Sequence, residues 1–290
     1  MTARGFGFLP EAPGQHDSLV VGADPDGPSL GRNPDASAVL AGAAPVPEEV
    51  VRLVTALPPF KNQEDTNTCV PHAIFNIAEA SLTATGSPIE PSSVPQLYCT
   101  TNALVQPPGT PLQDLGTYGR VALQVTKEWG VARDVDYPFR DSRTARIIPG
   151  IVTTAVPPDV HQRATSWKLD EQSTIYAQGQ DRLRTVDVIL AAIGGVVAAG
   201  VVDSKFMNYQ GRGVLGAPDL QDARGRHMTA IIGYRTNKTT RRREYLIRNS
   251  WPQWGLVLMD QVSLAWVDQD WVLAQEELYR LRVSRGRRTS

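Results

Sequence analysis

Four residues of this chain have the side chains that an acyl-transfer reaction needs. Gln63 and Cys69 lie six residues apart, and His227 and then Asn249 follow far downstream. A cysteine attacks a carbonyl carbon as its thiolate, and a histidine takes the thiol proton and later returns it to the leaving amine. An asparagine can orient the imidazole, and a glutamine amide can donate to the oxyanion together with a backbone N–H. The types and order of these residues predict a cysteine-nucleophile site.

The residues around Cys69 predict that it begins a helix. The segment 66–68, Thr-Asn-Thr, consists of residues that cap helices, and Pro71 fits only the first turn. Apolar residues then recur at helical spacing, so we expect a helix over 69–84. At a helix N-terminus the dipole and the free N–H groups favour anions. We therefore expect the pKa of the Cys69 thiol to lie well below that of an ordinary cysteine.

The motifs that contain these residues resemble those of the papain-like cysteine peptidases. Residues 60–63 (Phe-Lys-Asn-Gln) are similar to the family's approach to its oxyanion glutamine, and 249–255 (Asn-Ser-Trp-Pro-Gln-Trp-Gly) to its asparagine motif. Further similar segments are 114–117, 122–123, 129–131 and 136–139 in the middle of the chain, and 206–214 before the histidine. The resemblance covers residues 51–275. It implies Cys69 as nucleophile, His227 as base and acid, Asn249 as orienter and Gln63 as oxyanion donor.

The order of elements predicts an α+β fold, and the resemblance implies two lobes. Residues 1–50, rich in Pro, Gly, Ala and Asp, are expected to form an extended N-terminal arm. Residues 51–150 are expected to form a mainly helical lobe that carries the nucleophile, and 151–290 an antiparallel, barrel-like β lobe that carries His and Asn. Substrate would bind in the groove between the lobes. Further expected elements are helices at 115–129 and 186–192 and strands at 196–202, 228–234, 244–248 and 256–259.

Four residues are candidates for substrate binding. Gly109 and Thr110 belong to a Pro-Gly loop expected beside the cleft. Phe206 precedes the histidine strand, and Trp251 follows the asparagine, which it is expected to cover.

The arm has two interpretations. A tail that lies passively on the surface is the one we expect, together with activity that needs no N-terminal processing. The alternative is an arm that occupies the cleft and inhibits the enzyme, since a tethered segment has a high effective concentration.

Several residues depart from the family pattern. Val70 follows the cysteine where the family often has Trp, and Pro252 stands where it usually has Gly. Arg226, directly before the histidine, would disfavour an imidazolium. The sequence therefore predicts a divergent cysteine peptidase of bacterial or phage type. The alternative is a weak or inactive papain-like module that binds a ligand or forms part of a larger assembly.

Composition narrows the partners and the compartment. The net charge of the 290-residue chain is −1, which predicts no bulk attraction to nucleic acid or a membrane. If Cys69 is the nucleophile, Cys99 has no disulfide partner, and the first residues lack an apolar run of signal-peptide length. We therefore expect a cytoplasmic protein that acts on a peptide or protein substrate. No cofactor and no metal are expected, because the histidines lie apart from other ligand residues.

Overall fold

An open, eight-stranded antiparallel sheet is the central element of the computed structural model, which describes residues 6–12, 15, 35–36, 40, 43, 45–87, 89–164, 167–192 and 194–285. The strands follow the order β2 (Trp167–Thr174), β8 (Glu277–Arg285), β3 (Gly195–Asp203), β4 (Ala223–Thr236), β5 (Arg243–Arg248), β7 (Gln261–Asp268) and β6 (Leu256–Leu258). The short β1 (Glu49–Val50) pairs with β4. The expected α+β class is confirmed, but the sheet does not close, so the term barrel-like was too strong.

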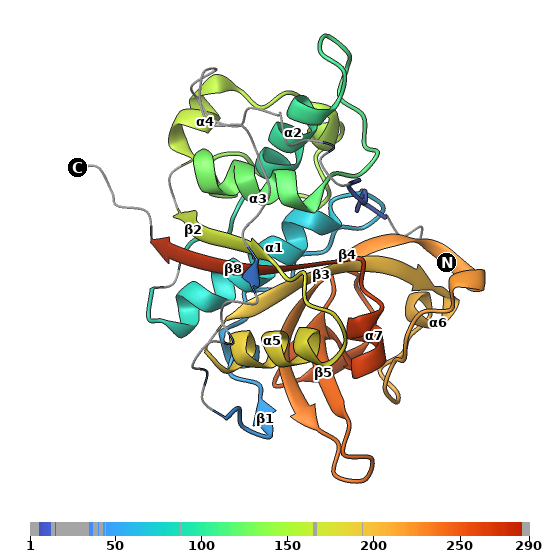
Figure 1. Ribbon diagram of the computed structural model, residues 1–290. Coiled ribbons are helices and arrows are strands. Elements are labelled where there is room, and N and C mark those ends of the chain that lie inside the picture. Colours follow the sequence, from blue (N-terminus) through green and yellow to red (C-terminus); the bar gives the residue numbers. More distant parts are fainter. Residues whose placement is uncertain are drawn as a thin grey trace.

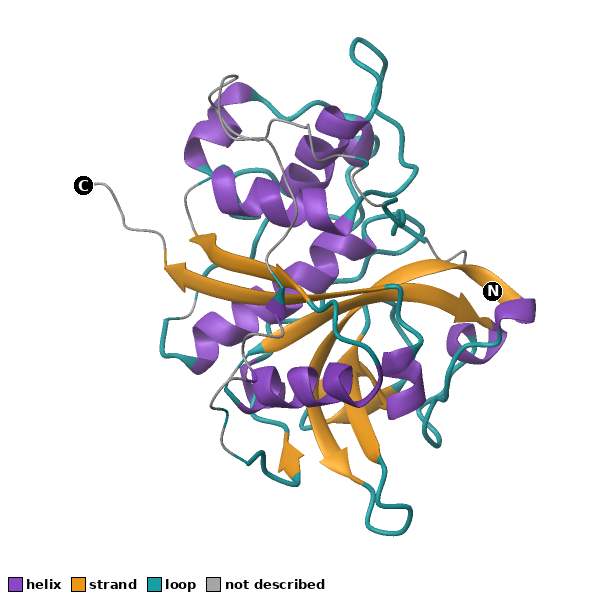
Figure 2. Ribbon diagram, in the orientation of Figure 1, coloured by secondary structure: helices purple, strands orange, loops and turns teal. Residues whose placement is uncertain are grey.

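Helices lie on both sides of the sheet (Figures 1 and 2). On one side are α2 (Val94–Val105), α3 (Gly119–Glu128) and α4 (Pro158–Arg163), with α1 (Cys69–Ala84) between them and the strands. On the other are α5 (Gly179–Ala191) and α7 (Gln269–Leu273), and α6 (Ser204–Met207) lies at the end of β3. Single turns of 3₁₀-helix occur at Val54–Ala56, Ile151–Thr153 and Leu220–Asp222.

The alternation of side chains along β3 divides the interior into two cores. Val197 and Ala199 pack into the core that contains α1, α2 and α3, whereas Val196 and Ala198 pack into the core on the α5 side. Successive residues of a strand point to opposite faces, so a strand covered on both faces is apolar throughout. This explains the continuous apolar run of β3.

Helix α1 begins at Cys69 and ends at Ala84, as the sequence predicted. All of its residues from Cys69 to Leu82 are buried, because α1 packs against α2 and α3 on one side and β3, β4 and β8 on the other. A buried helix needs apolar residues around its whole circumference, which this segment largely supplies. The nucleophile is therefore fixed to one of the most enclosed elements of the fold.

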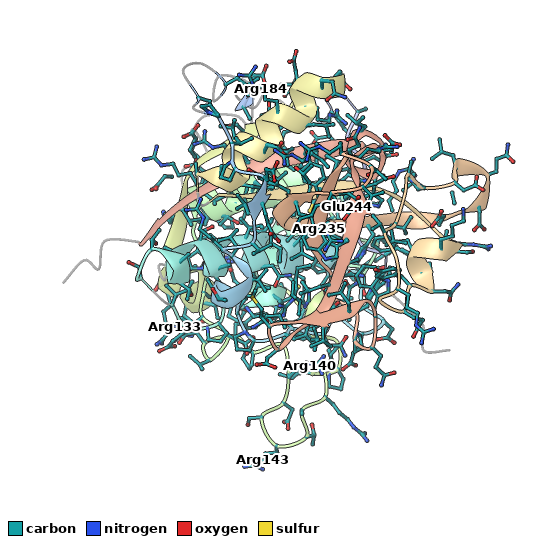
Figure 3. The ribbon with its side chains drawn as sticks, turned by 90° about the horizontal axis from the view of Figure 1, so that it is seen from below. Arg133, Arg140, Arg143, Arg184, Arg235 and Glu244 are labelled. Carbon is teal, nitrogen blue, oxygen red and sulfur yellow. The ribbon has the colours of Figure 1, made fainter. Side chains whose placement is uncertain are left out.

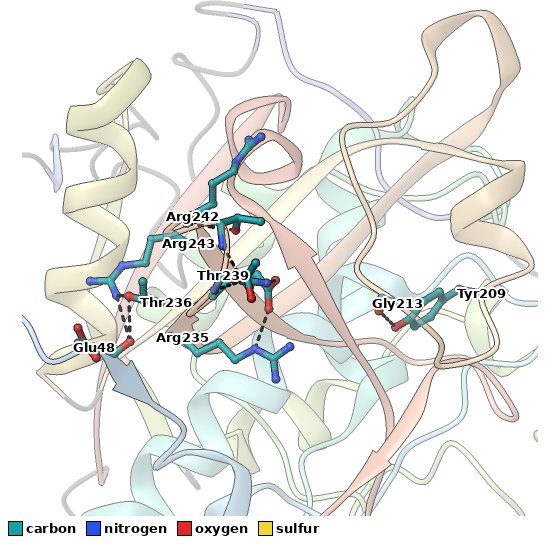
Figure 4. A network of polar contacts seen from close by, with 11 residues as sticks. Glu48, Tyr209, Gly213, Arg235, Thr236, Thr239, Arg242 and Arg243 are labelled. Carbon is teal, nitrogen blue, oxygen red and sulfur yellow. Dashed lines mark hydrogen bonds and ion pairs between the residues drawn. The ribbon is translucent and has the colours of Figure 1, made fainter.

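The hairpin of β4 and β5 sets the distance between the histidine and the asparagine. His227 lies on β4, and Asn249 directly follows β5. At the far end of the hairpin Arg235 Nε lies 2.7 Å from Glu244 Oε2, and Arg243 Nη1 donates to the Glu48 carbonyl at 3.1 Å (Figure 4). The first contact joins the two strands of the hairpin, and the second ties the hairpin to the residue before β1.

No helix in the described part of the chain has both the length and the apolar character needed to cross a bilayer.

Candidate active site

Cys69 is the first residue of α1, and its side chain is fully buried. Burial raises the pKa of the Cys69 thiol to about 12, and hydrogen bonds from the backbone amides of Met228, Gly7, Cys69 and Val70 offset only part of that rise. The expectation of a low thiol pKa was therefore wrong for this form of the protein. Its physical reason is desolvation, which disfavours the thiolate more than the helix N-terminus favours it.

His227 and Asn249 form the buried hydrogen bond that the sequence pattern predicts. His227 Nε2 lies 2.7 Å from Asn249 Oδ1, and an amide oxygen can only accept, so Nε2 carries the proton. The neutral ring then has Nδ1 as its basic nitrogen. Trp251 stacks on the imidazole with the ring centroids 4.3 Å apart and excludes water from this bond.

The backbone brings the histidine to the nucleophile. The Met228 amide that bonds the Cys69 sulfur belongs to the residue directly after His227 on β4. A ring nitrogen of His227 within hydrogen-bond reach of Cys69 Sγ stays a prediction.

Gln63 is buried beside Asn249's neighbour Ser250. The backbone N–H of Gln63 donates to the Ser250 carbonyl at 3.1 Å, and the Ser250 hydroxyl donates to the side-chain oxygen Oε1 of Gln63. Gln63 Nε2 donates to the Thr66 carbonyl at 2.8 Å. These bonds fix which end of the side-chain amide is the nitrogen and direct it toward the loop before Cys69. Ser250 was read from the sequence only as part of a motif, and its contact with Gln63 reveals its role.

Arg140 fixes the residues on both sides of Gln63. Its guanidinium donates to the Asn62 carbonyl and to Glu64 Oε1, each at 2.6 Å. Figure 3 shows Arg140 at the base of the loop that carries Arg143 at its tip. The sequence carried no signal for this contact, because the loop follows Gln63 by more than seventy residues.

Residues 6–11 of the N-terminal arm lie beside the N-terminal end of α1, where Cys69 is located. We call residues 6–11 the strap (dark blue in Figure 1). The Gly7 backbone lies near Cys69 and partly offsets the rise that burial causes in the pKa of its thiol, the Gly7 carbonyl accepts from the Thr117 amide at 2.7 Å, and the Leu9 amide donates to the Thr117 carbonyl at 2.9 Å. The strap thus pairs with Thr117 as an extended peptide would. Gly7 and Phe8 are buried, so this part of the arm does not lie on the surface as expected, whereas a passive or inhibitory role of the arm stays a prediction. Most of the remaining arm lies outside the described residues.

The two ends of the strap are anchored. Phe6 packs edge-on against Trp251, and Phe8 is buried in the core on the α1 side. Glu11 pairs with Arg120, whose Nε lies 3.2 Å from Glu11 Oε2, and the Glu11 amide donates to Glu277 Oε1 at 3.2 Å. Apolar burial and these polar contacts together hold Gly7 over the nucleophile.

The remaining candidates lie in different surroundings. Gly109 and Thr110 form an exposed turn in which the Thr110 hydroxyl donates to the Pro107 carbonyl. Phe206 is buried among aromatic rings, with its ring centroid 6.2 Å from that of His227 and 4.9 Å from that of Trp254. A substrate role for these residues and for Trp251 stays a prediction.

Two further groups near the site have clear structural roles. Arg226 directs its guanidinium to Glu276 at 3.0 Å, so a carboxylate offsets the charge beside the histidine. His72, one turn along α1, bonds the Thr68 carbonyl through Nδ1 at 2.7 Å, and burial lowers its pKa to about 3. A ring that is neutral and bonded to its own helix is poorly placed to act as the base.

Comparison with known proteins agrees with this geometry. The family model of the papain family cysteine proteases matches residues 49–257. Xylellain, a cysteine protease from Xylella fastidiosa, is 19% identical with a TM-score of 0.68 and 98% of each chain covered. ProCathepsin B S9 from Trypanosoma congolense is 14% identical with a TM-score of 0.64, covering 97% of this chain and 87% of that one. Bromelain from Ananas comosus, in complex with the E64 inhibitor, is 17% identical with a TM-score of 0.60, covering 81% and 99%. No curated sequence matches the chain.

Proposed function

Since this chain belongs to the papain family of cysteine proteases, we propose that it is a peptidase that cleaves peptide bonds through an acyl-enzyme on Cys69. The observation that carries the proposal is the His227–Asn249 hydrogen bond beneath Trp251. This hydrogen bond fixes the tautomer of His227 in which Nδ1 is the base. The next residue, Met228, has its backbone amide beside the Cys69 sulfur.

The reaction assigns one step to each residue. His227 Nδ1 takes the thiol proton, and the thiolate of Cys69 attacks the carbonyl carbon of the substrate. The oxyanion that forms accepts hydrogen bonds from the Cys69 amide and from the second Nε2 hydrogen of Gln63, since the first donates to Thr66. The imidazolium then protonates the leaving amine, and water hydrolyses the thioester with His227 again as base.

The strap makes this form of the chain a closed one. Gly7 lies beside the thiol that must attack, and Gly7 and Leu9 together take the Thr117 N–H and C=O groups that an extended substrate would use. Substrate and strap therefore compete for the same place, and turnover requires the strap to leave. This supports the inhibitory interpretation of the arm over the passive one.

We also assign the protein to a reducing compartment such as the cytoplasm. Cys69 and Cys99 are both free thiols, and Cys99 donates its S–H to the Ile151 carbonyl in the core at 3.3 Å. A nucleophilic thiol must stay reduced to act. Incubation of the protein lacking residues 2–45 in oxidised rather than reduced glutathione should abolish its turnover, and recovery on reduction is the expected control.

Hydrolysis of a mixed peptide library tests the proposed function. We expect cleavage by the protein lacking residues 2–45 and none by the same protein with Cys69→Ala. A protein that is inert in both forms, with Cys69 no more reactive than Cys99, would favour the alternative of a papain-like binding module.

A further inference from the structure

The strap passes through a slot with two backbone walls. On one side is Asn67, two residues before the nucleophile: a Cβ on Gly7 would lie 1.7 Å from the Asn67 carbonyl oxygen. On the other side is Gly116, where a Cβ would lie 2.7 Å from the Gly7 carbonyl oxygen. Asn67 and Gly116 therefore both touch the backbone of Gly7. The separation of these two walls decides whether an extended peptide reaches both Cys69 and Thr117.

Asp114 forms direct hydrogen bonds with Asn67, the first wall of the slot. The Asn67 amide donates to both oxygens of the Asp114 carboxylate, at 3.1 and 3.2 Å, and the Asn67 side chain donates to the Asp114 carbonyl at 2.6 Å. Three hydrogen bonds thus join the loop before the nucleophile to the segment that leads to Thr117. Hydrogen bonds to a charged group are stronger than those between neutral groups.

Tyr98 extends this connection to the Gly116 wall. Its hydroxyl donates to Asp114 Oδ1 at 2.5 Å and accepts from the Gly116 amide at 2.9 Å. Tyr98 lies on α2 and is fully buried, so its ring is held by the helical core. The phenol uses its one donor and one of its acceptor positions to place Gly116 relative to Asp114.

We propose that Asp114 and Tyr98 are positioning residues that fix the width of this slot and thereby the binding of extended peptides. The inference rests on the proposed peptidase function. Neither side chain touches the reacting atoms. The pair acts through Asn67 and Gly116, and a substrate that ends before Thr117 does not use it.

The test compares two substrates in the full-length chain carrying Gly7→Ala, which loosens the strap by one methyl group. One substrate is a peptide long enough to pair with Thr117, and the other is a minimal amide that reaches only Cys69 and Gln63. The strap lowers kcat/KM for both by the same factor, so their ratio is independent of how far it opens. Adding Tyr98→Phe should lower the ratio of kcat/KM for the extended peptide to kcat/KM for the minimal amide about tenfold, which is equivalent to about 1.4 kcal/mol. The change should fall on KM for the extended peptide.

Tyr137→Phe is the matched control. Tyr137 lies in the same core, and its buried hydroxyl has no hydrogen-bond partner among the described residues. It should leave the ratio unchanged. An unchanged ratio in Tyr98→Phe, or an equal change in both variants, would overturn the proposal.

Hydrogen exchange gives a reading that needs no activity. In Tyr98→Phe the Gly116 amide loses its acceptor and should exchange about tenfold faster, whereas α1 keeps its protection. Equal acceleration in α1 would mean general destabilisation and would contradict a positioning role. If neither this parent nor the chain lacking residues 2–45 cleaves either substrate, the proposed function fails, while the exchange result still decides on the slot. If Tyr98→Phe does not fold, Asp114→Asn is measured in the same way, and loss of the fold in both variants rejects the proposal.

Discussion

Gly7→Ala should open the active site, because the structure leaves no room for a methyl group at that position. The added Cβ would lie 1.7 Å from the Asn67 carbonyl oxygen and 2.2 Å from the carbonyl carbon. Ordinary contacts between heavy atoms are about 3.5–4.0 Å, so the strap has to move by well over 1 Å. Asn67 cannot retreat easily, since Asp114 holds it with three hydrogen bonds.

The magnitude follows from the bonds that this movement breaks. The Thr117 amide loses the Gly7 carbonyl, and the Leu9 amide next to it loses the Thr117 carbonyl. At about 1 kcal/mol net for each bond, the strap is weakened by about 2 kcal/mol. The open fraction then rises about 30-fold, because each 1.36 kcal/mol corresponds to a factor of ten. The anchors at Phe8 and Glu11 stay, so the effect is smaller than that of deleting the arm.

The assay measures Cys69 alkylation by a small electrophile at neutral pH, with Cys99 as internal reference and peptide mass spectrometry to separate the two sites. Peptide hydrolysis should rise by the same factor of about 30. Gly216→Ala is the control, because its added methyl would lie 3.7 Å from Asp268 Oδ2, an ordinary contact. The same rates in Gly7→Ala and the unchanged chain would refute the blocking role of the strap, and so would an equal rise in Gly216→Ala.

Three other predictions concern the catalytic residues. In the Gly7→Ala background, Gln63→Ala should lower kcat by about 10²–10³ with an unchanged melting temperature, if Gln63 works as an oxyanion donor; an unchanged kcat would remove it from the mechanism. Ser250→Ala should lower kcat less, by about tenfold, because Gln63 stays but one bond that orients it is lost; a loss as large as that of Gln63→Ala would assign Ser250 a more direct role. In the unchanged chain the ultraviolet thiolate absorbance of Cys69, taken as the difference from Cys69→Ala, should stay near zero from pH 7 to 10, because the pKa of the buried thiol, about 12, lies above this window; a full thiolate signal near neutral pH would show a thiolate already formed under the strap.

Local patterns in the sequence were sufficient for much of the fold. The helix over 69–84 was correct at both ends, because the Thr-Asn-Thr segment, Pro71 and the apolar spacing all agree. The apolar runs at 196–202 and 228–234 mark the centres of β3 and β4, although both strands extend further. The predicted helix over 115–129 starts only at Gly119, since the preceding residues pair with the strap instead.

Other elements depend on long-range contacts that local patterns do not encode. β2 and β8 carry charged residues along much of their length and pair with each other, so their strand signal was missed. Helix α2 was missed as well, although Ser93 caps it and Pro95 lies in its first turn.

At the site, the residue types of Cys69, His227, Asn249 and Gln63 were readable from the sequence because the chemistry limits which side chains can serve. The contacts of Gly7, Arg140 and Ser250 with these residues or their chain neighbours were not, since each joins segments far apart in the chain. The raised thiol pKa was unpredictable for the same reason: it results from burial, which long-range packing of the folded chain produces.

The most direct test of the account is the dependence of Cys69 reactivity on His227 in the full-length Gly7→Ala chain. Alkylation rates of Cys69 and Cys99 are measured at neutral pH with His227 present and with His227→Ala. If His227 is the base, Cys69 should react at least about 10²-fold faster than Cys99, and His227→Ala should remove that advantage while leaving Cys99 unchanged. Equal reactivity of Cys69 with and without His227 would contradict the proposed nucleophile and base.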